Sequence, residues 1–177
     1  MILRRLLVVL ALIGTTIVAG ASAHTTTNQD PQDTEASPFD LRTVGLGHNS
    51  NELTGKAVTW GHYAKSELIP KGNTFYLDLD VDPDDQLDYY VSMFAKEGGS
   101  LVGKVYKRKA GTDPYKGSAR VTRSAASNGD SVLSVEISRS LVGVSGSGQV
   151  IRYRWFSQYN GDTYDDAPNS GWYKLTI

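Results

Sequence analysis

The sequence predicts an all-β fold, a single antiparallel β-sandwich of the jelly-roll type with about eight or nine strands. The first observation is a hydrophobic period of two, which gives a strand one core-facing side and one outward side. The second is the recurrence of turn residues between the alternating segments. The third is that no helix-length segment has an apolar pattern of helical period. The sequence therefore favours a sandwich over helical or mixed architectures.

The clearest strand covers residues 73–82, in which odd positions are apolar and the even positions are Tyr76 followed by aspartates. Residues 87–95, 133–137 and 150–159 alternate in the same way, so each is expected to bury one side. Trp155 falls on the apolar side of the last segment, which predicts a core position.

Weaker signals complete the expected strand set. Turn sequences such as Asn128-Gly129-Asp130 and Asn160-Gly161-Asp162 separate the segments. The one helical turn expected lies at residues 138–142. The weaker strands are expected at residues 41–48, 56–63, 101–107, 119–123 and 172–177.

The chain divides into three segments. Residues 1–23 combine an early basic pair, an apolar run and an Ala21-Ser22-Ala23 cleavage pattern, which predicts a secretory signal peptide. A retained membrane anchor is the alternative, but the apolar run is shorter than the ~20 residues that span a bilayer. Residues 24–37 contain no large apolar side chain and are expected to form a disordered leader. Residues 38–177 are expected to form the sandwich domain.

Charge and cysteine content limit the function. The chain has 18 basic and 19 acidic residues, which excludes the large basic excess of nucleic-acid binders. It has no cysteine, which excludes disulfides and cysteine-based metal sites. An exported chain without disulfides must be stabilised by core packing or bound ions, and a bacterial extracellular protein fits this composition.

An acidic stretch predicts a cation site. Residues 78–88 contain six aspartates and no base, and such close like charges favour a hard cation such as Ca²⁺. An EF-hand is excluded because Pro83 stands where that loop requires glycine. The alternative is a solvated acidic face that pairs across the sheet with Arg152 and Arg154. The candidate ligands for a structural Ca²⁺ are Asp80, Asp82, Asp84, Asp88 and Asp166.

Two further regions are candidates for binding. Aromatic rings with polar edges suit the faces of sugar rings, and Trp60, Tyr164 and Trp172 lie near polar loops. Residues 104–123 carry seven basic residues against Asp113 alone. This basic region is predicted either to bind an acidic polymer or to discourage edge-to-edge pairing of sheets.

Short motifs resemble a known group of proteins. A Pro38-Phe39-Asp40 start, a Phe-Tyr-Leu-Asp-Leu-Asp-Val-Asp strand at 75–82 and a closing Asp166-Ala167-Pro168-Asn169-x-Gly171 are similar to secreted β-sandwich domains of the CBM9-like and DOMON-like group. The resemblance implies either a carbohydrate-binding module, in some members with structural calcium, or a haem-binding domain with Met and His ligands. Met93 is expected on the inner face of its strand, which disfavours the haem branch.

These observations predict a secreted, non-catalytic binding module for an extracellular or cell-wall glycan, with no membrane span after signal cleavage. The first alternative is a structural or protein-interaction domain of the cell envelope. The second is a hydrolase, which would need paired carboxylates or a Ser-His pair in a concave site.

Overall fold

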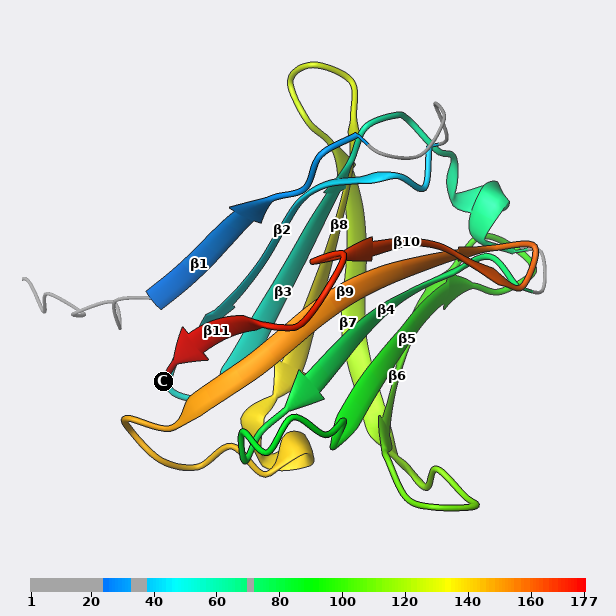
Figure 1. Cartoon of the computed structure of the whole chain (residues 1–177). Coiled ribbons are helices and arrows are strands. Elements are labelled where there is room, and N and C mark those ends of the chain that lie inside the picture. Colours follow the sequence, from blue (N-terminus) through cyan, green and yellow to red (C-terminus); the bar gives the residue numbers. More distant parts are fainter. Residues whose placement is uncertain (1–23, 33–37, 70–71) are drawn as a thin grey trace, which may run out of the picture.

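The computed structural model describes residues 24–32, 38–69 and 72–177 and confirms an all-β antiparallel fold (Figure 1). The described residues form eleven strands and two short 3-10 turns, η1 (Lys65–Leu68) and η2 (Arg139–Val142). The strands are β1 (His24–Gln29), β2 (Leu41–His48), β3 (Glu52–Thr59), β4 (Thr74–Asp80), β5 (Tyr89–Ala95), β6 (Leu101–Lys107), β7 (Tyr115–Ala125), β8 (Ser131–Ser138), β9 (Val150–Tyr159), β10 (Asp162–Ala167) and β11 (Tyr173–Thr176).

All eleven strands belong to one antiparallel sheet that curls into a sandwich-like shape. Its order is β1-β2-β3-β8-β7-β6-β5-β4-β9-β10, and β11 also pairs with β9. The long β7 joins the two halves, because its first part pairs with β6 and its second part pairs with β8. Contacts of β2 with β9 and β10, and of β1 with β11, bring the two ends of the sheet together (Figure 1).

The core fills the space between the two halves of the sheet. Trp155 on β9 is fully buried and faces Gly55 on β3, where a side chain would collide with the indole. Met93 is also fully buried, as the alternation predicts. The apolar positions of the four clearest strands therefore supply much of this core: Phe75, Leu77, Leu79, Val91, Met93, Leu133, Val135, Ile137, Ile151 and Trp155.

The first strand differs from the expected disordered leader. Residues 24–29 form β1, which pairs with β2 along its whole length. Thr26 Oγ1 and Asn28 Nδ2 each lie 2.8 Å from the buried hydroxyl of Tyr153. Backbone and polar hydrogen bonds can hold an edge strand without large apolar side chains. The polar composition of residues 24–29 therefore did not indicate disorder.

The remaining difference concerns the number of strands. No strand was expected at residues 162–167, but they form β10 beside β9. β1 and β10 raise the number of strands above the expected eight or nine. The 3-10 turn η2 lies within the expected helical turn at 138–142.

The predicted signal segment, residues 1–23, lies outside the described residues, as do residues 33–37 of the predicted leader. Within the described ranges, no helix is both long and apolar enough to cross a membrane.

The Gly55 position gives a test of the packing between the two halves. A Cβ at Gly55 would lie 2.8 Å from Trp155 Cζ2 and 2.9 Å from Val135 Cγ1. We therefore expect Gly55→Ala to lower the free energy of unfolding by about 1–3 kcal/mol, measured by urea denaturation. The matched control is Gly146→Ala, where a Cβ meets nothing within 4 Å, and its effect should stay within about 0.5 kcal/mol. Equal effects of the two substitutions would contradict this packing.

Candidate functional site

The pairing of β4 with β9 sets the chemistry of the outer face. In this antiparallel register Tyr76 lies opposite Phe156, Asp78 opposite Arg154 and Asp80 opposite Arg152. The intervening residues, such as Leu77 and Trp155, point into the core because side chains alternate along a strand. The even positions of the two strands therefore form a mixed aromatic and charged surface.

A row of aromatic rings crosses this surface from β9 to β7. Tyr76 stacks on Phe156 with ring centroids 4.5 Å apart, and Tyr90 stacks on Tyr106 at 5.0 Å. The ring centroids of Tyr76 and Tyr90 lie 6.3 Å apart, so the two stacked pairs are in contact. Tyr115 packs edge-on against Tyr106, with ring centroids 5.8 Å apart. Five strands thus contribute one continuous row of rings.

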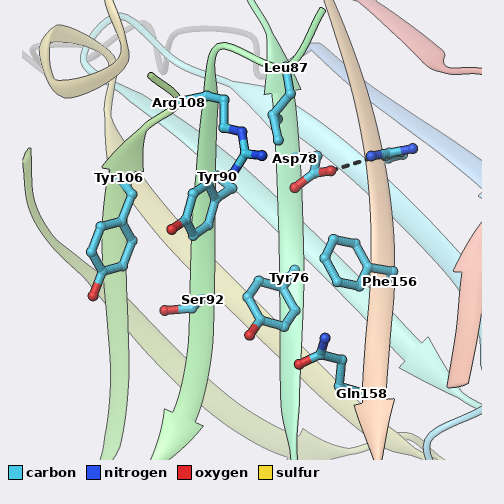
Figure 2. Close-up of a pocket in the computed structure, with 10 residues that line it drawn as sticks. Tyr76, Asp78, Leu87, Tyr90, Ser92, Tyr106, Arg108, Phe156 and Gln158 are labelled. Atoms are coloured by element: carbon cyan, nitrogen blue, oxygen red, sulfur yellow. Dashed lines mark hydrogen bonds and ion pairs between the residues drawn. The ribbon is translucent and has the colours of Figure 1, made fainter. Parts of the chain in front are cut away.

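Four of the five rings, all except Tyr115, line a concave site of about 520 Å³, here called the aromatic groove (Figure 2). Figure 2 shows Tyr106, Tyr90, Tyr76 and Phe156 side by side on adjacent strands, with Gln158 at one end and Leu87 and Arg108 at the other. The groove is lined by Tyr76, Asp78, Leu87, Tyr90, Ser92, Tyr106, Arg108, Arg154, Phe156 and Gln158.

Asp78 is the most deeply placed charge of the groove. It is 2% exposed, and its Oδ2 accepts a hydrogen bond from Arg154 Nε at 2.9 Å. Burial raises the pKa of the Asp78 carboxyl to about 6, while the guanidinium of Arg154 opposes the rise. Asp166 lies near the same guanidinium, and burial raises its pKa as well.

A second ion pair closes the other side of the groove. Arg108 Nη1 lies 2.8 Å from Asp113 Oδ2, and the Tyr90 hydroxyl donates to the same oxygen at 3.3 Å. The backbone N–H of Lys109 donates to Asp113 Oδ1 and, with Arg108, lowers the pKa of this carboxyl. Both arginines of the groove are therefore paired with a carboxylate.

The acidic turn, residues 80–88, borders the groove. Asp80 pairs with Arg152 and Asp78 pairs with Arg154, so the predicted pairing across the sheet is present. The expectation that this acidic face is solvated is wrong, because both aspartates are buried. Oxygens of Asp80, Asp82 and Asp88 lie within 4.8 Å of one another.

The other two predicted metal ligands are not part of this group. Asp84 accepts hydrogen bonds from the N–H and the side chain of Gln86. Asp166 stands on β10 opposite Phe156. The structure therefore brings together three of the five predicted metal ligands.

The three predicted ligand-binding rings have different neighbours. Trp60 is stacked by Arg42 and lies in a separate pocket of about 430 Å³ with Asn128. Tyr164 packs against Tyr159. Trp172 lies against Arg154, a residue of the aromatic groove, with 4.9 Å between the ring centroid and Arg154 Cζ.

The basic region does not form one separate patch. Arg108 lines the groove, Arg120 pairs with Glu136, and Arg123 stacks on Tyr63. Lys104 lies over Phe94 and Lys107 over Tyr89. Much of the apparent basic excess is thus engaged with carboxylates or rings.

The residues that sequence reasoning missed are Tyr76, Tyr90, Tyr106 and Phe156. Tyr76, Tyr90 and Phe156 lie at outward positions of strands predicted from alternation, and Tyr106 lies on a more weakly predicted strand. The signal that could have identified them was a large aromatic ring on the outward side of a strand. Which rings meet depends on strand order, and β9 pairs with β4 across a long stretch of sequence.

Comparisons of the chain with protein-family models, curated proteins and solved structures give no match. The aromatic groove and the acidic turn are therefore the features of the chain that point to a function.

The buried Asp78 carboxyl predicts a characteristic pH response. Because its pKa in the folded state lies above the unfolded value of about 3.9, the folded state binds more protons between about pH 4 and 6. The contribution of Asp78 to stability is therefore greatest at low pH and declines as the pH rises through about 6. An NMR titration should give the Asp78 carboxyl a midpoint near about 6.

The Asp113 carboxyl serves as an internal reference in the same titration, since its pKa is lowered and its midpoint should be acid-shifted. Asp78→Asn should remove the decline in unfolding free energy between about pH 4 and 6. A midpoint for Asp78 at or below its unfolded value would contradict the burial argument.

Proposed function

We propose that the protein is a non-catalytic binding module whose aromatic groove takes a segment of a neutral polysaccharide. The observation that carries the proposal is the continuous row of rings across adjacent strands, bordered by hydrogen-bonding side chains. Apolar ring surfaces suit the C–H faces of sugars, and the polar neighbours suit sugar hydroxyls.

The fixed geometry of the rings supports this use. Tyr76 and Phe156 are nearly parallel, at 9°, and Tyr90 and Tyr106 at 17°. Rings that already support one another lose little conformational freedom when a ligand binds, so more of the contact energy appears as affinity. The open shape of the groove suits a chain rather than an enclosed small molecule.

The charge balance of the groove supports a neutral ligand. Arg154 is neutralised by Asp78, and Arg108 is neutralised by Asp113. An acidic polymer would have to compete with these carboxylates for the guanidinium groups. Neutral hydroxyls can instead hydrogen-bond to the paired groups without separating them.

Binding without catalysis is part of the proposal. Asp78 is almost fully buried and held by Arg154, which suits a positioning group better than an acid catalyst that must reach a glycosidic oxygen. Export of the chain is likewise proposed from the signal-like segment at residues 1–23.

The proposal predicts which ring is needed for binding. We expect Tyr76→Ala to weaken binding of a neutral polysaccharide about tenfold, because it removes the central ring of the row. Isothermal titration calorimetry with soluble glucans, mannans and xylans measures the affinity, and alginate and heparin serve as acidic comparators. Thermal melting of each variant shows that it is folded.

Trp60→Ala is the matched control, since it removes a large exposed ring from a different pocket. Its affinity should equal that of the unchanged protein. An equal loss in both variants, or tighter binding to the acidic polymers, would contradict the proposed site. Release of reducing ends would favour a hydrolase, and capture of an envelope protein without glycan binding would favour an interaction domain.

A further inference from the structure

In the described part of the chain, the ion pairs of the acidic turn leave part of its negative charge unbalanced. Oxygens of Asp80, Asp82 and Asp88 lie within 4.8 Å of one another. The guanidinium that meets this group is Arg152, whose Nε lies 3.1 Å from Asp80 Oδ2. Arg152 also binds Asp85 through Nη1, so its single positive charge is shared with a further carboxylate.

The buried carboxylate of Asp80 is only partly satisfied by its neighbours. It is fully buried, and its Oδ2 is occupied by Arg152 and by the N–H of Asp85 at 3.1 Å. Its Oδ1 is buried without a hydrogen-bond partner in the described part of the chain. A buried carboxylate oxygen without a partner is unfavourable, and a bound cation would satisfy it.

The backbone of the turn holds the carboxylates in place. The N–H of Val81 donates to Asp88 Oδ2 at 2.8 Å, and the N–H of Asp88 donates to the carbonyl of Leu79 at 3.0 Å. These bonds join the end of β4 to the start of β5.

We propose that the acidic turn binds one Ca²⁺ ion through Asp80, Asp82 and Asp88. All three side chains offer hard oxygen atoms, and neither histidine nor cysteine belongs to the group, which favours Ca²⁺ or Mg²⁺ over softer metals. Ca²⁺ accepts irregular shells completed by water and carbonyl oxygens, whereas Mg²⁺ requires near-octahedral geometry. The exposed position of Asp82 leaves one side open to water ligands.

The site lies at one end of the aromatic groove but does not depend on the function proposed for that groove. The carbonyl of Asp88 accepts the N–H of Arg108 at 2.6 Å, and Leu87 lines the groove directly (Figure 2). An ion that fixes Asp88 would therefore also fix the turn beside Leu87 and Arg108.

Calorimetric titration of the chelator-treated protein with CaCl₂ tests the site. The unchanged chain should bind one ion, and its melting temperature should rise in millimolar Ca²⁺. Asp82→Asn should weaken binding about tenfold or more, because affinity depends on the number of charged ligands, and should reduce the thermal shift. Asp82 is exposed, so this substitution is expected to leave the fold intact.

Asp84→Asn is the matched control, since it removes an equal charge from the same turn outside the proposed ligand set. It should bind Ca²⁺ as the unchanged chain does. Absence of binding in the unchanged chain would overturn the site, and so would an equal loss in both variants, which would indicate a general charge effect. Because no glycan is present, the result is separate from that of the polysaccharide experiment.

Discussion

The antiparallel register between β4 and β9 is the constraint on which the rest of the structure depends. It places Leu77 opposite Trp155 in the core, and it places Asp78 opposite Arg154 on the outer face. A slip of one residue would move every side chain to the other face, which would bury charges and expose the indole. Core packing, the ion pairs, the aromatic row and the acidic turn are thus consequences of one strand pairing.

This arrangement gives the aromatic groove a rigid floor. Its rings stand on strands whose opposite sides are packed in the core, so the positions of Tyr76 and Phe156 are fixed by backbone pairing rather than by loops. Arg154 connects the floor to the neighbouring segment, since it binds Asp78 and lies over Trp172. Sites supported in this way are held more closely than sites built on loops.

Local patterns in the sequence predict much of the fold but only part of the candidate site. The alternation at 73–82 and 150–159 predicts the apolar core positions and the side that carries the aspartates and arginines. It does not predict the burial of Asp78 and Asp80, which pair with Arg154 and Arg152. β1 was not predicted because it is held by backbone hydrogen bonds to β2 and by the Tyr153 hydroxyl. The aromatic row was not predicted because the order of strands that are far apart in sequence decides which rings are adjacent. Asp166 was expected near the acidic turn, but β10 carries it toward Arg154.

The proposed recognition surface is the outer face of β9, β4, β5 and β6. An NMR titration of the isotope-labelled protein with a bound neutral oligosaccharide maps the contact surface directly. The largest shift changes should fall on Tyr76, Tyr90, Tyr106 and Phe156, with little change around Trp60 or on the outer face of β1 to β3. Changes centred on Trp60, or spread over the β1 to β3 face, would contradict the claim.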